Sequence, residues 1–264
     1  GLKRLEYRGY DSAGVAVHEP DKIQRIRVLG KVTALANTLK TNPIEGQLGI
    51  AHTRWATHGE PSERNAHPHF SNEEVAVVHN GIIENHETLR KQLITAGYLF
   101  KSETDTEVIC HLIHQEYQTT NNPIQSIRLA LKRIQGAYAL CIIFKDQPDK
   151  LYATRHGSPL VIGLGDNAHF IASDQIALLT ATQKFIHLGE GDLALLSQDS
   201  IHIEDIKQTP VTHDIVTANI KLETTHKGAY PHYMAKEIHE QPKSLLDTIG
   251  NHIQDTVPDA CFGP

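Results

Sequence analysis

The chain has 264 residues, of which 39% are hydrophobic and 21% are charged, and its formal net charge is -6 at pH 7. This composition is typical of a soluble globular protein with one large or two modest domains. The acidic balance argues against partners bound by bulk charge attraction, namely nucleic acid and anionic membranes, and leaves room only for a local basic pocket.

Cysteine usage and apolar runs narrow the class further. Cys110, Cys141 and Cys261 lie far apart and lack CxxC spacing, which argues against a disulfide framework and a thiolate zinc site. No apolar run approaches the roughly 20 residues of a membrane-spanning helix, and no signal-peptide pattern opens the chain. We therefore expect a cytoplasmic protein with no membrane partner.

The first part of the chain alternates strand and helix patterns. "GLKRLEYRGYDSAG" resembles the last turns of a helix that stops near Gly9, and "AGVAVHEPDKIQRIRVLG" predicts a hairpin about a Pro-Asp turn. "VTALANTLK" has helical spacing, whereas "QLGIAHTRW" and "EEVAVVHNGIIE" predict strands. "ENHETLRKQLITAG" predicts a helix with Gly97 in the C-cap position.

The middle of the chain changes from helices to strands. "SETDTEVICHLIHQEY" predicts a helix that begins with a capping box at Thr104 and Glu107, and "NPIQSIRLALKRIQG" predicts a second helix. From "AYALCIIF" to about residue 205, short apolar runs predict antiparallel strands. Strands clustered first and last indicate an α+β fold with helical layers outside the sheets. After residue 225 helical spacing returns, interrupted at Pro242, as in a linker helix that docks on another domain.

The segment "HTRWATHGEPSERNAHPH", residues 52–69, contains four histidines, two arginines and the only tryptophan. A metal site is one interpretation, because His67 and His69 could chelate together with His52 or His58. No HExxH motif, paired CxxC motif or regular carboxylate spacing supports that site, and we expect no metal.

The same segment can form a pocket for an anionic substrate. Arg54 follows an apolar strand and can bind a carboxylate through two parallel hydrogen bonds. Thr57 and His58 add donors in the loop, and Trp55 can close over a small ligand. A solvated loop with Trp55 in the core is the competing interpretation, and the residues alone leave both open.

Two further segments likewise have both a structural and a functional interpretation. The Asn80-Gly81 pair in "VVHNGII" is a strong hairpin signal, and it can also form an oxyanion hole from a side-chain amide and a backbone N–H. Asp105 is favourable on a helix's first turn, and it can also accept a substrate ammonium.

Taken together, the arginine, the aspartate and the Asn-Gly pair could bind an α-amino acid substrate whose side-chain carbonyl carbon is attacked by a nucleophile. A nucleophile is missing from the set, because Cys110 and Cys141 read as core residues away from these groups.

Seven segments closely resemble the glutaminase half of the glutamine:fructose-6-phosphate aminotransferases, also called glucosamine-6-phosphate synthases. They are "LEYRGYDSAG", "HTRWATHGEPSERNAHPH", "VVHNGIIENHETLR", "SETDTEVI", "GSPLVIGLG", "IASDQIALL" and "HYMAKEIHEQP". The resemblance implies the four-layer αββα sandwich of N-terminal nucleophile hydrolases. It also implies a glutaminase domain over residues 1–222 that lacks its N-terminal strand, and a linker over 223–264 toward an absent sugar-isomerase domain.

The resemblance supplies a nucleophile and a substrate. Members of the family begin with a cysteine whose thiol attacks the glutamine amide while its own α-amino group acts as base, and that cysteine is not in this sequence. Arg54, helped by Thr57 and His58, is implied to bind the α-carboxylate of L-glutamine. Asp105 is implied to bind the α-ammonium.

Further roles follow from the same resemblance. Asn80 and Gly81 are implied to form the oxyanion hole, and Trp55 to lie over the site and gate the route of ammonia. Arg8 is implied to lie close to the nucleophile, and His67 near the pocket. No cofactor is implied.

The resemblance also implies partners and a limitation. The complete enzyme is expected to transfer ammonia to fructose 6-phosphate, giving glucosamine 6-phosphate, and to be a homo-oligomer. This chain alone is expected to be inactive, with an unpaired strand edge and an exposed hydrophobic strip that reduce its stability.

Two alternatives stay open. The chain can be a catalytically inactive module that binds glutamine, or the glutaminase domain of another amidotransferase with an N-terminal cysteine, such as the phosphoribosylpyrophosphate-dependent enzyme or asparagine synthetase. The runs "RWATHGEP" and "HYMAKEIHEQP" favour the fructose-6-phosphate enzyme.

Overall fold

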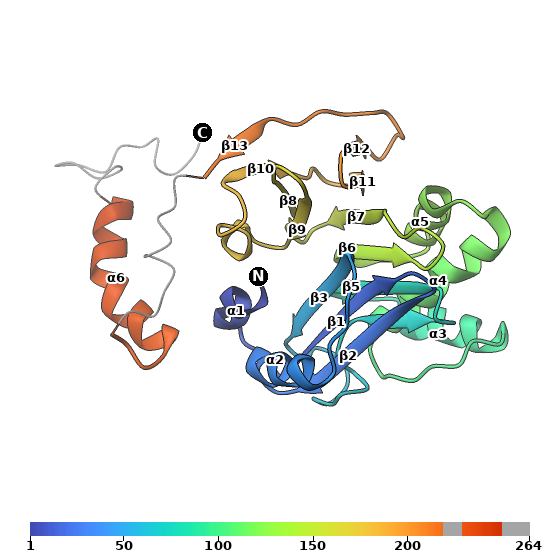
Figure 1. Cartoon of the computed structure of the whole chain (residues 1–264), viewed down its shortest axis with the longest axis horizontal. Helices are drawn as coiled ribbons and strands as arrows, with labels where there is room; N and C mark the ends of the chain where they lie inside the picture. The colour runs from blue at the N-terminus through green and yellow to red at the C-terminus, as the bar shows by residue number, and fades with distance from the viewer. Residues whose placement is uncertain (219–228, 250–264) are drawn as a thin grey trace. The chain divides into compact units, whose positions relative to one another are not determined.

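The computed structural model describes residues 1–218 and 229–249 of the chain (Figure 1). The chain divides into two compact units, Gly1–Asn219 and Ile220–Pro264. In the second unit the described element is the helix α6 (Tyr233–Ile249), which continues through Pro242, so the expected interruption there is wrong. No described helix is both long and apolar enough to cross a bilayer.

The first unit opens with a short helical segment and a three-stranded sheet. α1 (Leu2–Leu5) and the 3-10 helix η1 (Glu6–Arg8) stop at Gly9, as predicted. β1 (Ser12–Glu19) and β2 (Lys22–Leu29) form the predicted antiparallel hairpin about Pro20-Asp21. After α2 (Val32–Thr41), β3 (Leu48–Arg54) pairs with the other side of β1, which gives the sheet order β2-β1-β3.

The centre of the unit is a six-stranded sheet of order β12-β11-β7-β6-β5-β4. Its strands are β4 (His69–Ser71), β5 (Val75–Ile83), β6 (Gly136–Phe144), β7 (Leu151–His156), β11 (Leu193–Leu196) and β12 (Ile201–Glu204). A four-stranded sheet of order β13-β10-β8-β9 contains β8 (Val161–Leu164), β9 (His169–Ala172), β10 (Lys184–His187) and β13 (Ile215–Thr217), with the 3-10 helix η2 (Gln175–Ala177) after β9.

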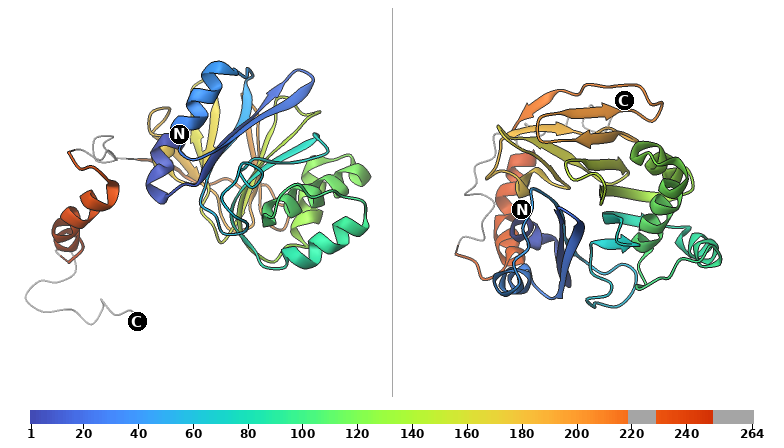
Figure 2. Two further views of the ribbon diagram at one scale, coloured as in Figure 1. Left: turned by 90° about the horizontal axis from the view of Figure 1, so that it is seen from below. Right: turned by 45° about the vertical axis from the view of Figure 1, so that its right-hand side comes forward.

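Helices cover one face of the central sheet. α3 (His86–Thr95), α4 (Asp105–Thr120) and α5 (Pro123–Leu131), green in Figures 1 and 2, pack their apolar residues against it. On β5, Val75 and Val77 face these helices, whereas Ala76 and Val78 face the opposite side. Because strand side chains alternate between faces, the fully apolar run of β5 matches a strand buried on both sides.

The two smaller sheets cover the other face. One buried cluster packs strands β1, β2 and β3 against β5 and β6 of the central sheet. Another packs β8 and β10 against β6, β7, β11 and β12. α2 and α1 pack on the outer side of β1 and β2. The layers therefore run helix, sheet, sheet, helix, which confirms the expected αββα sandwich, with the second β layer divided into two sheets.

The Asn80-Gly81 pair lies inside β5 rather than at a hairpin turn. Its residues pair with Ala139 and Tyr138 of β6. The hairpin interpretation is therefore wrong, because the long β5–β6 pairing overrides the local turn preference. Gly81 nevertheless has a φ of 138°, and a Cβ there would lie 2.0 Å from the carbonyl oxygen of Ala137.

The N-terminus of α4 is built as its sequence predicts, with one difference. The Thr104 hydroxyl accepts a hydrogen bond from the Glu107 N–H at 3.3 Å, which is the expected N-cap. The Glu107 carboxylate instead accepts the backbone N–H groups of Lys101 and Ser102, at 2.8 and 2.7 Å. The cap therefore ties α4 to the preceding loop as well as closing the helix.

Replacing Thr104 by alanine is expected to lower the free energy of unfolding by about 1–2 kcal/mol, because the helix loses its N-cap acceptor. Urea unfolding of the chain measures this change. Thr104→Ser is the matched control, since it keeps the oxygen and loses only a methyl group. Equal destabilisation by both variants would mean that methyl packing, and not the cap, carries the effect.

Candidate functional site

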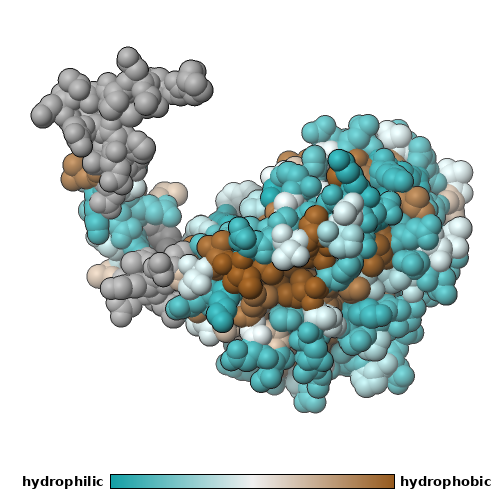
Figure 3. Space-filling view, turned by 90° about the horizontal axis from the view of Figure 1, so that it is seen from above, coloured by the Kyte–Doolittle hydropathy of each residue, from teal (hydrophilic) through white to brown (hydrophobic). Residues whose placement is uncertain are grey.

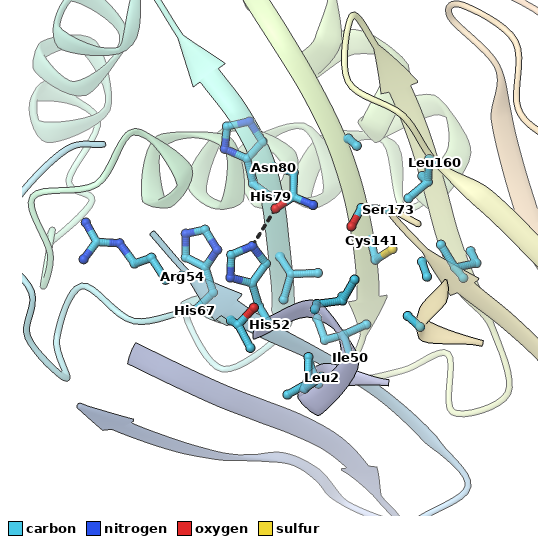
Figure 4. Close-up of a pocket in the computed structure, with 18 of the residues that line it drawn as sticks. Leu2, Ile50, His52, Arg54, His67, His79, Asn80, Cys141, Leu160 and Ser173 are labelled. Atoms are coloured by element: carbon cyan, nitrogen blue, oxygen red, sulfur yellow. Dashed lines mark hydrogen bonds between the residues drawn. The ribbon is translucent and has the colours of Figure 1, made fainter. Parts of the chain in front are cut away.

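A cavity of about 590 Å³ lies beneath α1, between β3 on one side and β9 on the other (Figure 4). β3 and β9 are edge strands of their sheets, so the outer edge of each strand has no hydrogen-bonded strand partner among the described residues. The apolar lining includes Val78 and Cys141 from the central sheet, Ile50 from β3 and Ile171 from β9. The cavity is thus a groove with two open strand edges and an apolar floor.

All nine residues singled out from the sequence line this cavity, although they come from four separate segments. They are Arg8, Arg54, Trp55, Thr57, His58, His67, Asn80, Gly81 and Asp105. The structure therefore brings the whole candidate set together.

Asp105 is placed by the start of α4 and is 3% exposed. Its Oδ2 accepts the backbone N–H of Ile83 at 2.8 Å. Its Oδ1 lies 3.9 Å from Nδ1 of His58, and its Oδ2 lies 3.9 Å from Nδ1 of His79. A buried carboxylate with one oxygen held and the other facing a cavity can accept a cationic group of a ligand.

Arg54 ends β3 and holds the loop that follows. Its Nη2 donates to the carbonyl oxygens of His58 and Gly59, and its Nη1 lies 3.5 Å from Oδ1 of Asp11. Burial lowers the pKa of the guanidinium, and Asp11 opposes that shift. In Figure 4 its head group points away from Asn80, so the charge lies at the end of the cavity.

Trp55 covers Gly9 at the cavity mouth. It is 67% exposed, so the interpretation that places it in the core is wrong. A Cβ at Gly9, where φ is 94°, would lie 2.0 Å from Cε3 of the indole. The close contact explains why a glycine ends η1, because any side chain there would displace Trp55.

Arg8 links two segments that are far apart in the chain. Its Nη1 donates to the Ser173 hydroxyl at 3.0 Å, and its Nη2 pairs with Asp174 Oδ2 at 2.7 Å. These contacts join η1 to the segment after β9 across the cavity mouth.

Three histidines form a row beside the cavity, in which His67 and His69 are buried and His52 is partly buried. The ring centroids of His52 and His67 are 4.3 Å apart, and those of His67 and His69 are 4.9 Å apart. Burial lowers the pKa of His52 to about 4 and holds the pKa values of His67 and His69 well below 6.5. All three imidazoles are therefore neutral at pH 7.

The sequence interpretation missed several neighbours of the site. Asp11 and His79 are not among the predicted site residues, yet both lie beside the candidate charges. Cys141 was read as a core residue away from the site, but it lines the cavity. Burial raises the pKa of its thiol to about 12, so it is a poor nucleophile.

Metal binding finds no support among the described residues. They contain no group of three or more His, Cys, Asp or Glu side chains arranged to hold an ion.

The histidine row is expected to make the fold acid-sensitive. Because the folded-state pKa values lie below the unfolded value, the unfolded chain takes up protons first as the pH falls. Stability should be full above about pH 6.5 and should fall toward pH 4, by at most about 1.4 kcal/mol per pH unit for each histidine.

Urea unfolding at pH 7 and pH 5 measures this slope. The exposed His187 provides a control, since His187→Gln should leave the slope unchanged whereas His67→Gln should reduce it. An identical slope in the His67→Gln variant would count against the row as the source.

Comparison with known proteins identifies the family of the chain. The family described as glutamine amidotransferase domain matches residues 52–180. A glutamine–fructose-6-phosphate aminotransferase (isomerizing) of Pseudomonas aeruginosa is 52% identical over 266 residues, covering 100% of this chain and 44% of that protein. The corresponding protein of Shewanella oneidensis is 49% identical over 264 residues, covering 100% and 43%. The chain spans less than half the length of these relatives.

Solved structures with lower sequence identity to this chain also belong to the glutamine amidotransferases. The glutamine phosphoribosylpyrophosphate amidotransferase of B. subtilis superposes with a TM-score of 0.67 at 25% identity, covering 77% of this chain and 45% of that one. The identity to the fructose-6-phosphate enzymes is twice as high, which favours them over the other amidotransferases. By sequence and by fold, the chain belongs to the glutamine amidotransferases of the N-terminal nucleophile type and matches the glutaminase half of the glutamine–fructose-6-phosphate aminotransferases.

Proposed function

We propose that this chain binds L-glutamine and forms the glutaminase half of an enzyme that releases ammonia for transfer to fructose 6-phosphate, giving glucosamine 6-phosphate. The observation that carries the proposal is the convergence of Asp105, Arg54 and the Asn80-Gly81 pair on one cavity. An acceptor for an ammonium, a cation for a carboxylate and two donors for an oxyanion are what an amide-bearing α-amino acid requires.

The α-amino acid end of glutamine binds between Asp105 and the loop after β3. Asp105 Oδ1 has no hydrogen bond among the described residues and is the acceptor for the α-ammonium. Arg54 already donates to loop carbonyls, so it supplies positive charge and holds the loop. Thr57 and His58 in that loop supply donors for the α-carboxylate.

The amide end of glutamine reaches Asn80 and Gly81. Attack of a thiolate on the amide carbon forms a carbon–sulfur bond and places negative charge on the carbonyl oxygen, which the two donors stabilise. Collapse expels ammonia, with the proton supplied by the protonated base that had accepted it from the thiol, and water then cleaves the thioester to glutamate and restores the thiol.

The nucleophile belongs on an extended segment in the groove between β3 and β9. Two open strand edges offer unpaired backbone groups to such a segment, and the apolar floor can bury its alternate side chains. A cysteine at the end of the segment would lie near Asn80, with Trp55 covering the site.

The second unit supports a role in contacts with a partner domain. Four apolar residues of α6 are mostly exposed, namely Met234, Ile238, Leu245 and Leu246. Apolar side chains also gather on one face of the first unit (Figure 3). Exposed apolar surfaces of this kind are typical of docking faces. We therefore assign residues 1–222 to the glutaminase domain and residues 223–264 to a linker toward the sugar-isomerase domain. The complete enzyme in this proposal is a cytoplasmic homo-oligomer.

Asp105→Asn is expected to weaken L-glutamine binding at least about 10-fold, because the α-ammonium loses its charged acceptor. Calorimetric titration of the chain with L-glutamine measures the affinity. Glu103→Gln removes a neighbouring exposed carboxylate and should leave the affinity unchanged.

Unchanged affinity in the Asp105→Asn variant would contradict the assigned ammonium site, and no binding by the unmodified chain would contradict the proposed function. Binding without glutamate release by the complete natural protein would instead favour the inactive glutamine-binding module.

A further inference from the structure

We propose that His52 is a positioning residue that turns the amide NH₂ of Asn80 into the cavity, where it serves the oxyanion. This inference rests on the proposed function and adds a residue to it. The contact lies between β3 and β5, which come from different sheets (Figure 4).

One hydrogen bond sets the orientation of Asn80. Nε2 of His52 lies 2.8 Å from Oδ1 of Asn80, so the imidazole N–H donates and the amide oxygen accepts. No other hydrogen bond holds this side chain among the described residues. With its oxygen occupied, Asn80 presents only its two N–H donors to the cavity.

Charge state favours this arrangement. With its pKa lowered to about 4 by burial, His52 is neutral at pH 7, and a neutral imidazole carries one proton, here on Nε2. The same low pKa and the engaged Nε2 make His52 unsuited to act as a general base near neutral pH.

The ring of His52 is held by the histidine row. His67 packs against it, His69 follows, and Nε2 of His69 lies 3.1 Å from the Thr104 hydroxyl that caps α4. The row thus connects Asn80 to the helix that begins at Asp105. The two ends of the glutamine site are fixed to one buried framework.

A structural role alone does not explain a histidine at this position. Nδ1 of His52 and Nδ1 of His67 are buried without a hydrogen-bond partner among the described residues. Buried polar atoms of this kind are unfavourable, and the neighbouring cavity residues Ile50 and Val78 show that apolar side chains fit the strip. The donor to Asn80 is the function that accounts for the imidazole.

The test compares three His52 variants in the complete enzyme that carries this domain. His52→Leu and His52→Met remove the donor, and His52→Gln retains an N–H that can reach Asn80. The first two should lower the glutaminase kcat by about 10-fold or more with little change in KM, because an oxyanion donor acts in the transition state. His52→Gln should recover most of the rate, and the pH profile from 6 to 8 should not move.

A double-mutant cycle separates positioning from general damage. In an Asn80→Ala background, His52→Leu should have almost no further effect on kcat, because its target is gone. Additive losses, or a His52→Gln enzyme as slow as His52→Leu, would overturn the proposal. An Asn80→Ala enzyme with full glutaminase activity would instead count against the proposed function.

If His52→Leu fails to fold, His52→Met keeps the side-chain volume and the cycle is run with it. A crystal structure of that variant gives a readout besides activity. Loss of the single Asn80 orientation is expected, and an unchanged amide orientation would overturn the proposal.

Discussion

The pairing of β5 with β6 is the constraint on which the rest of the site depends. Nine residue pairs join the two strands, from Val75 with Phe144 to Ile83 with Gly136. This pairing keeps Asn80 and Gly81 in a strand of the central sheet, which has helices on one face and the second β layer on the other. It also delivers the Ile83 N–H to Asp105, which anchors the start of α4 at the cavity. A change in register by one residue would turn Asn80 to the helical face.

The site contains several buried polar and charged groups that lower the stability of the folded protein. Arg54, Asp105, His67 and His69 are buried, and some histidine nitrogens have no partner among the described residues. Groups of this kind reduce stability unless hydrogen bonds, ion pairs or a bound ligand satisfy them. The large apolar cluster between the central sheet and α3 to α5, which includes Ile113, Leu140 and Phe144, supplies compensating stability through the burial of apolar surface.

Much of the architecture could be predicted because local patterns and tertiary packing agree. The β1–β2 hairpin, the Thr104 cap and the apolar run of β5 each have a local physical signal that the fold retains. β4 at His69–Ser71 was not predicted, because three residues carry no periodicity. The hairpin at Asn80-Gly81 was predicted as one alternative and is absent, because a nine-residue strand pairing outweighs one turn preference.

The sequence by itself determined the order of the elements, the residue types of the candidate site and, through its resemblance to a family, their expected grouping. Only the tertiary structure decided which hydrogen-bonding groups of those residues are engaged within the protein and which remain available to a ligand. Arg54 could be predicted to bind a carboxylate from its position, yet its contacts with loop carbonyls and Asp11 follow from three-dimensional folding alone. His52 could be read as a metal ligand or a loop residue, and only the approach of β3 to β5 places it against Asn80. The physical reason is that a hydrogen bond depends on the distance between atoms far apart in the chain, which local sequence patterns do not encode.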